Sequence, residues 1–436
     1  MHKTRLWPIF YYKEFMSDEI SAAQAKDENY GWRVTFAGMG INLALGVLYT
    51  WSVISKGMPE SWKWSEASKS WPYSIACLMF SIIMVPAGRM QDKISPRVVA
   101  SIGGILVGIG LISASMTTSP LGYIVGFGIL GGMGIGFGYA SATPPAVKWF
   151  PAARTGLIAG IVVSGFGLAS VYAAPLTSWL ISTWSIKTAV MTLGIAFLAV
   201  VVLLAQLLKV PPRGYVPPGQ KITKTGDTLN RKEDFTAGEM LGTAQFYMLW
   251  FMYACGAGAG LMVIGKLAAI AKIQAGINLG FILVAVLAVG NGAGRIIAGL
   301  LSDKIGRKTT MFVCFVMQAI LVFLLSQTVE NNVLAKVPIL ALVSALIGAN
   351  YGANLSLFPS VTKDYYGLKN FGLNYGLVFT AWGVGGFTLA LLAGKLYDKY
   401  HTFSFAYYGA CVLLILAAAM VFFVKAPQHK LEAATA

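Results

Sequence analysis

An arginine within an apolar run is the residue of this chain whose type and position most clearly predict chemistry. The stretch from Asn278 to Leu301 has Arg295 as its one charged residue, and a run of this length can cross a bilayer as a helix. With Asp303 near the interface, a rise of about 1.5 Å per residue puts Arg295 about 12 Å deep. A cation there costs about 2.5 kcal/mol or more. We therefore predict that Arg295 binds an anionic solute; the alternative is an arginine that snorkels or is paired structurally.

Asn291 lies one helical turn before Arg295 and shares its face. Its amide could hold the guanidinium or contact the solute itself. The glycines around it, Gly290, Gly292 and Gly294, would allow another backbone or a ligand to approach closely.

Aromatic side chains in other apolar runs could line the same cavity. Tyr139 and Tyr351 each follow glycine-rich sequence, and a tyrosine inside a membrane needs a partner for its hydroxyl group. Tyr375, Phe379 and Trp382 are spaced to share one helical face. Such a stripe either lines a cavity or packs against neighbouring helices.

Amide side chains have the same two readings. Asn42, Asn350 and Asn354 fall in apolar runs, where amides contact solutes or hydrogen-bond between helices. Lys266 lies near the end of its run, and we expect it to snorkel to the interface.

Other chemistries find no support in the residue content. The three histidines, His2, His401 and His429, lie at ends or interfaces, so no histidine proton relay is expected. No catalytic triad, carboxylate pair, HExxH motif or Walker lysine falls at membrane depth. We expect no enzyme activity, metal or organic cofactor, and no ring of charges or filter loop indicates a channel.

The element that positions Arg295 is one of many similar runs. The chain has 436 residues, of which 56% are hydrophobic and 11% charged, with a mean hydropathy of +0.68, which indicates an all-α membrane protein. Twelve runs predict transmembrane helices at roughly 32–54, 71–90, 97–118, 121–146, 155–179, 187–208, 245–268, 278–301, 308–328, 336–358, 371–394 and 402–425.

The basic residues are unevenly distributed between the loops. The formal net charge is +16, but most of the Lys and Arg residues fall in the loops that share a side with the N-terminus. This is the positive-inside pattern of membrane proteins. It predicts cytoplasmic termini and gives no support to nucleic-acid binding. Cys77, Cys255, Cys314 and Cys411 fall in separate apolar runs, where a thiol behaves as a small apolar side chain.

One long polar segment divides the chain. Residues 209–244 are rich in Lys, Pro, Gly and Thr and predict a cytoplasmic linker between six-helix bundles at 32–208 and 245–425. The linker should end in a short interfacial helix. Residues 1–31 form a polar N-terminal segment and residues 426–436 a C-terminal tail.

The two bundles carry a repeat. The sequence GRMQDKISPR begins at Gly88 and GLLSDKIGRK begins at Gly299. Parallel six-helix repeats indicate a pseudo-symmetric transporter architecture. Under this alignment Met84 stands opposite Arg295, so the arginine occurs in one half alone. This favours a ligand role over a role in folding or topology.

These motifs resemble the signature of the major facilitator superfamily. The resemblance implies that the two motif copies latch the halves electrostatically during transport, and the residues concerned are Gly88, Asp92, Arg97, Gly299, Asp303 and Arg307. The aspartates lie too close to the membrane surface to bind a solute at mid-depth.

Further segments are similar to the oxalate/formate antiporter family, in the monocarboxylate-transporter branch of that superfamily. They are YTWSV, KWFPAARTGLIAGI, GEMLGTAQFYMLW and SLFPSVTKDYYGLKNFGLNYG. In animal-type members helix 8 reads Gly-Asp-x-x-x-Arg and the arginine binds the carboxylate. The resemblance assigns this role to Arg295, with Asn291 in place of the aspartate. Oxalate carriers have a lysine where Trp382 stands here.

The resemblance implies a proton-linked symporter of small monocarboxylates such as lactate or pyruvate. One intramembrane cation matches one carboxylate, because a dianion would leave a buried charge unpaired. Two alternatives are an exchanger of the oxalate/formate type and a carboxylate sensor that does not transport. We expect a monomer in the plasma membrane, the inner membrane in a bacterium, whose partners are the carboxylate and the lipid bilayer.

Overall fold

The computed structural model describes residues 30–151, 154–212, 215, 217, 235–276, 280–330, 332–367 and 370–427. Over this part of the chain, twelve helices are long and apolar enough to cross a membrane. The prediction of an all-α protein with twelve spans is therefore confirmed. Predicted linker and terminal residues that fall in the gaps lie outside the described residues.

The first six spans form the N-half and the last six form the C-half. The first span runs over Tyr30–Lys56, and its final part is the 3-10 segment η1 (Gly46–Thr50) and α2 (Trp51–Lys56). The remaining elements of the N-half are η2 (Glu60–Trp62), α3 (Glu66–Lys93), α4 (Pro96–Ser115), α5 (Pro120–Tyr123), the π-helical η3 (Ile124–Gly131), α6 (Gly132–Val147), α7 (Thr155–Thr183) and α8 (Ile186–Ala205).

The C-half begins with a short helix that precedes its first span. The elements are α9 (Ala237–Leu241), α10 (Ala244–Ala275), α11 (Gly280–Ile305), α12 (Arg307–Ser326), η5 (Val333–Ala335), α13 (Val337–Tyr366), α14 (Phe371–Tyr400) and α15 (Ser404–Phe423). The short helix predicted before the seventh span is α9. It starts in a capping box, in which the Thr236 side chain accepts from the Glu239 backbone and the Glu239 side chain accepts from the Thr236 backbone.

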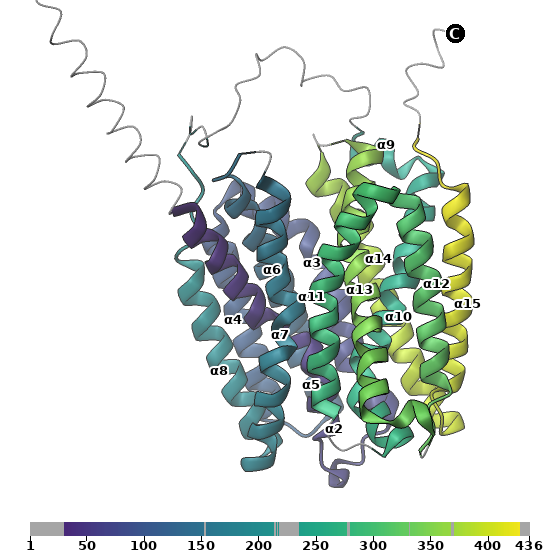
Figure 1. Cartoon of the computed structure of the whole chain (residues 1–436). Helices are drawn as coiled ribbons and strands as arrows, with labels where there is room; N and C mark the ends of the chain where they lie inside the picture. The colour runs from purple at the N-terminus through teal and green to yellow at the C-terminus, as the bar shows by residue number, and fades with distance from the viewer. Residues whose placement is uncertain are drawn as a thin grey trace, which may run out of the picture.

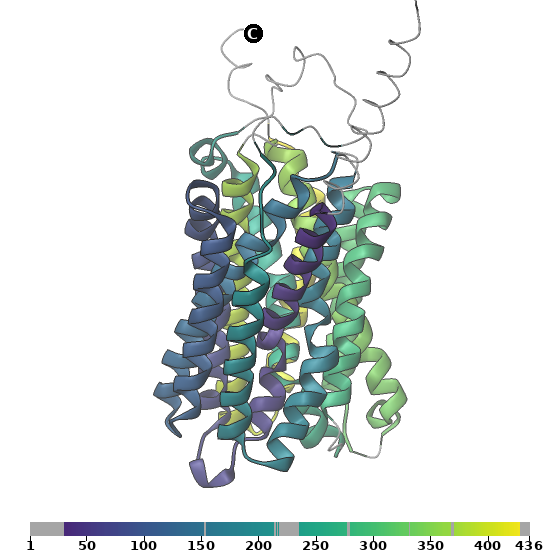
Figure 2. The same cartoon turned by 90° about the vertical axis from the view of Figure 1, so that its left-hand side faces the viewer.

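The two halves lie side by side, with α4, α6 and α8 on one flank and α12 and α15 on the other (Figure 1). We call the two ends of the molecule the α9 end and the α2 end, after the elements found there. Turned by 90°, the long helices run between these two ends (Figure 2). Across the middle, α3 packs on α14 and α11 packs on α7. These two contacts bring the halves together.

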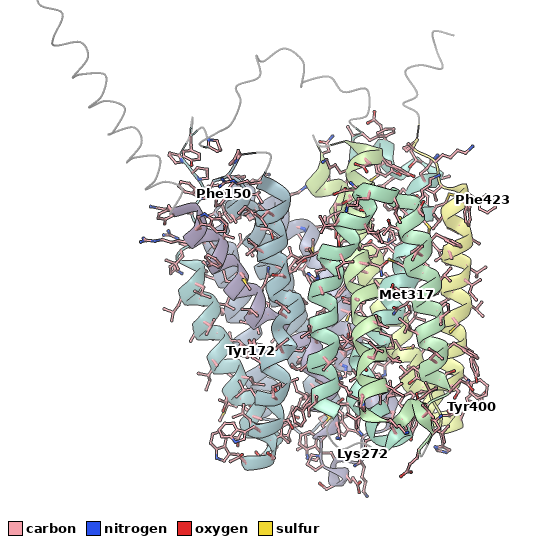
Figure 3. All side chains as sticks on the ribbon, viewed as in Figure 1. Phe150, Tyr172, Lys272, Met317, Tyr400 and Phe423 are labelled. Atoms are coloured by element: carbon pink, nitrogen blue, oxygen red, sulfur yellow. The ribbon has the colours of Figure 1, made fainter. Side chains whose placement is uncertain are left out.

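The outward surface of the bundle is apolar. Side chains such as Met317 and Phe423 project from the outer faces of the C-half (Figure 3), and Phe423 is 71% exposed. Exposed apolar side chains on long helices are suited to contact with lipid. This surface agrees with the composition that predicts a membrane protein.

The start of the second span differs from its prediction. The second span starts at Glu66, before the predicted residue 71, because Ser65 caps α3 by accepting a hydrogen bond from the Ser68 backbone. An extra helical turn with an acidic residue therefore precedes the apolar run.

Candidate functional site

Helix α11 is fixed at the centre of the molecule by its glycines. A side-chain carbon added at Gly290 would lie 1.9 Å from the Ala345 carbonyl oxygen, and one at Gly294 would lie 2.0 Å from that of Ala349. No larger residue fits, so the α11 backbone rests directly on α13. The prediction that these glycines admit another backbone is confirmed, and the contact holds the neighbouring Asn291 and Arg295 in place.

Arg295 reaches from the C-half to the N-half. Its Nη1 donates to the Val163 carbonyl of α7 at 2.9 Å, and its Nε donates to Asn291 Oδ1 at 3.2 Å. The guanidinium also faces Gly167, where a side-chain carbon would lie 3.4 Å from it. Asn291 therefore orients the cation, one of the two roles predicted for it.

The Arg295 charge is buried in the interior of the described bundle. Arg295 is 9% exposed, and among the described residues no carboxylate forms a salt bridge with it. Within the described part of the chain, its Nη2 and the Asn291 Nδ2 are buried donors without a hydrogen-bond partner. Buried donors without partners cost about 1–3 kcal/mol each, and more for a charged group. An anion that accepts from both would remove this cost, which makes the pair a candidate anion site.

Tyrosine hydroxyls lie beside this cation. Tyr139 is close enough to interact with the Arg295 guanidinium. Tyr49 of the N-half and Tyr351 of the C-half share a hydroxyl hydrogen bond of 2.6 Å, and Trp382 Nε1 donates to the Tyr351 oxygen at 2.8 Å. The structure thus joins the predicted Tyr351 and Trp382 directly, and it links Tyr351 to Tyr49 of the first span, which the sequence did not single out as a site residue.

Aromatic rings from both halves surround these polar groups. Phe80 of α3 lies 5.3 Å from Tyr139, 5.6 Å from Phe166 and 5.0 Å from Trp382, measured between ring centroids. Phe379 stacks on Trp382 at 5.2 Å. The predicted aromatic stripe of α14 therefore faces the centre. Phe80 and Phe166 were missed, because an isolated phenylalanine in an apolar run carries no distinguishing sequence signal.

Three of the remaining predicted residues form hydrogen bonds near the site or within their own helix. Asn42 donates to the Val162 carbonyl at 2.8 Å, the residue next to the carbonyl that accepts from Arg295. Asn350 donates to Leu346 of its own helix at 2.9 Å, and the Tyr375 hydroxyl lies 3.5 Å from that of Tyr253. Asn42 thus joins the first span to α7 beside Arg295.

The motif residues after α11 pair within the C-half. Arg307 binds Asp303 at 2.6 Å and Asp364 at the end of α13 at 3.1 Å. We expected Asp303 to contact the other half. The local pair forms because Gly306 connects α11 directly to α12, which begins at Arg307, and this tight connection keeps the guanidinium within reach of Asp303.

The rest of the motif residues make fewer described contacts. The side chain of Asp92 lies outside the described residues. A side-chain carbon at Gly88 or Gly299 would meet no atom of the described residues within 4 Å. Arg97 stands in the first turn of α4, where its backbone N–H donates to the Ser95 hydroxyl. The predicted latching role of these residues stays a prediction.

The expectation that Lys266 snorkels is wrong. Lys266 is 4% exposed, and its Nζ lies 2.8 Å from Glu66 Oε2. Snorkelling places an ammonium group in water when no buried partner exists. Here the extra turn of α3 supplies the carboxylate.

Known proteins resemble the chain over most of its length. The family model of the Major Facilitator Superfamily matches residues 35–285 and 264–436. The uncharacterized MFS-type transporter YhjX of Escherichia coli is 27% identical over 81% of this chain and 85% of its own length. The oxalate:formate antiporter of Oxalobacter formigenes is 29% identical over 77% of each chain. Mouse monocarboxylate transporter 11 is 25% identical over 91% of this chain and 87% of its own length.

The solved structures include one of the same fold. The bacterial homologue of the human lysosomal transporter Spinster, in an inward-facing and unoccupied conformation, has a TM-score of 0.66. It is 16% identical and covers 91% of this chain and 97% of its own.

Proposed function

The chain belongs to the Major Facilitator Superfamily, and we propose that it carries small monocarboxylates across a membrane by alternating access. Its relatives YhjX, the oxalate:formate antiporter and monocarboxylate transporter 11 are transporters rather than enzymes. One observation carries the proposal: the guanidinium of Arg295 is buried between the halves, and among the described residues its Nη2 has no hydrogen-bond partner and no carboxylate is paired with it. Arg295 binds the substrate carboxylate in this proposal, and the Asn291 amide and Tyr139 hydroxyl complete its hydrogen bonds.

The charge balance favours a substrate with one negative charge. The described helices bury two cations, Arg295 and Lys266, and Lys266 is already paired with Glu66. A dicarboxylate would therefore hold one charge without a partner, at a cost of several kcal/mol. The relatives support this chemical class, since two of them are named for carboxylates.

The surroundings of the arginine favour a short apolar or hydroxylated stem. Phe80, Phe379 and Trp382 offer ring faces beside the polar groups, and the Tyr49 and Tyr351 hydroxyls offer hydrogen bonds. Lactate and pyruvate have this combination of one carboxylate, a methyl group and one oxygen.

The distribution of positive charge orients the proposed transporter. We place the α9 end in the cytoplasm, because the loops on that side carry most of the Lys and Arg residues. Both termini then lie in the cytoplasm, and the protein acts as a monomer in the plasma membrane. The resemblance to monocarboxylate symporters supports a proton as the coupling ion.

A second candidate is an exchanger of two carboxylates. The observation that favours it is the lack, among the described residues, of a carboxylate paired with Arg295 that could take up the coupled proton. One of the similar proteins is an oxalate:formate antiporter. Exchange needs no protonated group, because the counter-substrate binds Arg295 on the return step in place of the first carboxylate.

Uptake into proteoliposomes tests both candidates. Labelled lactate should accumulate when the outside is acidic, and other monocarboxylates should compete with it better than oxalate or malonate. Uptake that requires an internal carboxylate and ignores the pH gradient would establish the exchanger. Competition by dicarboxylates as strong as by monocarboxylates would refute the assignment to monocarboxylates, and binding without flux would indicate a sensor.

A further inference from the structure

A cluster of four charged residues joins the two halves at the α2 end, away from the candidate anion site. Glu66 and Lys69 lie on α3 of the N-half, whereas Lys266 lies on α10 and Asp398 on α14 of the C-half. Two are acidic and two basic, so the cluster carries no net charge. Its contacts cross the interface that must separate when a transporter of this fold opens at this end.

The first contact is the buried ion pair between Glu66 and Lys266. The Lys266 ammonium donates to Glu66 Oε2 at 2.8 Å and to the Glu66 backbone carbonyl at 3.0 Å. The two side chains are 5% and 12% exposed. A buried charge whose partner is removed is strongly destabilised, so this contact can persist only while both charges are present.

The second contact places Asp398 at the start of α3. Its Oδ1 accepts from the Glu66 backbone N–H at 2.8 Å, and its Oδ2 accepts from that of Ala67 at 2.9 Å. The first N–H groups of a helix have no partner within the helix, and a carboxylate there also interacts favourably with the helix dipole. The C-half thus completes the cap of an N-half helix, since Ser65 of the N-half accepts from the Ser68 backbone.

Close backbone packing surrounds the charges. A side-chain carbon at Gly394 of α14 would lie 2.2 Å from Ser70 Oγ and 2.7 Å from the Glu66 carbonyl oxygen. One turn further along α3, the Tyr73 hydroxyl donates to the Leu261 carbonyl of α10 at 3.1 Å. The helix α3 is therefore held by α10 and α14 together over its first turns.

We propose that Glu66, Lys266 and Asp398 form a latch that closes the α2 end and must break each time the transporter opens there. The latch holds the halves together by electrostatic attraction. When it breaks, water hydrates the separated charged groups. The latch rests on the proposed function because it assumes alternating access, but it does not depend on which solute is carried.

A distance measurement between the halves tests the latch without any substrate. The four cysteines, all buried, are replaced by alanine, and spin labels are attached at Lys187→Cys and Lys336→Cys. These exposed residues stand at the starts of α8 and α13, one in each half at the α2 end. Electron–electron resonance of the purified full-length protein in nanodiscs then reports the separation of the halves.

The parent protein should show mainly the short distance, and Glu66→Gln or Lys266→Met should shift the ratio of long to short distances by about tenfold or more. Lys69→Met is the matched control, because Lys69 pairs with the same carboxylate at 2.8 Å from within its own helix. It should leave the distribution near that of the parent.

The exchange of the two charges in Glu66→Lys with Lys266→Glu should restore the short distance. Unchanged distances in both single variants would overturn the proposal, as would a shift in Lys69→Met as large as that in Glu66→Gln. If a single variant does not fold, the exchanged pair decides: recovery of a folded protein with the short distance supports the latch, and failure to recover either refutes it. A failure of monocarboxylate uptake would leave these distances unaffected, so the two hypotheses are tested separately.

Discussion

Replacement of Arg295 by alanine should abolish carboxylate binding with little effect on folding. The bound carboxylate would remain buried without its cation, and the loss of one partner from such a pair costs about 3–5 kcal/mol. Since about 1.4 kcal/mol corresponds to a tenfold change in affinity, the affinity should fall at least about a hundredfold. The substitution affects the free protein less, because the two lost hydrogen bonds, to Val163 and Asn291, are offset by removal of an uncompensated buried charge.

The assay compares three variants by substrate-dependent thermal shift and by uptake into proteoliposomes. Arg295→Lys keeps the charge but lacks the planar two-donor fork, so it should bind about tenfold more weakly than the parent. Arg33→Ala removes an exposed arginine from the first span and should behave as the parent does. Uptake by Arg295→Ala at the parent rate, with the protein equally expressed, would refute the reasoning.

Three further substitutions test the surroundings of the arginine. Asn291→Asp places a carboxylate beside the guanidinium, so uptake should fall at neutral pH and recover on acidification as the new carboxyl is protonated; a pH profile equal to that of the parent would contradict this. Tyr351→Phe removes the hydroxyl that hydrogen-bonds to Tyr49 and should change the apparent KM for lactate severalfold. The KM is measured from uptake at a series of lactate concentrations, and Tyr247→Phe, at an exposed tyrosine, is the control. Gly294→Ala would place a side-chain carbon 2.0 Å from the Ala349 carbonyl oxygen, so it should lower the melting temperature by several degrees. Gly409→Ala is the control, because its added carbon meets no atom of the described residues within 4 Å, and it should leave the melting temperature unchanged.

The number and approximate positions of the transmembrane helices could be predicted because they depend on the length and composition of each apolar run. A span needs about 20 apolar residues whatever it packs against, so all twelve spans are visible in the sequence. The position of Arg295 along its helix follows from the same arithmetic. Its orientation by Asn291 also follows, since residues four apart share a helical face.

The partners that lie far apart along the chain could not be predicted. The carbonyl that accepts from Arg295 belongs to Val163, and a backbone acceptor has no sequence signature. Lys266 was assigned to the interface because its partner, Glu66, is 200 residues away and precedes the apolar run. Because Ser65 caps α3, the helix begins at Glu66, a polar residue that hydropathy alone assigns to the preceding loop.

The proposed transport mechanism accounts for the contrast between the two buried cations, Arg295 and Lys266. In the proposed mechanism, binding of the solute must lower the free energy of the site. Among the described residues no opposite charge pairs with Arg295, which leaves its donors for the proposed anion. A gate must open and close at little net cost, and a buried ion pair meets this requirement, because the hydration that Glu66 and Lys266 recover on opening roughly offsets their lost attraction. An apolar seal would instead cost about 25 cal/mol for each Å² exposed at every opening. In the proposed mechanism, the charged latch is therefore a contact at the α2 end that can be broken repeatedly, while the central arginine stays available to the carboxylate.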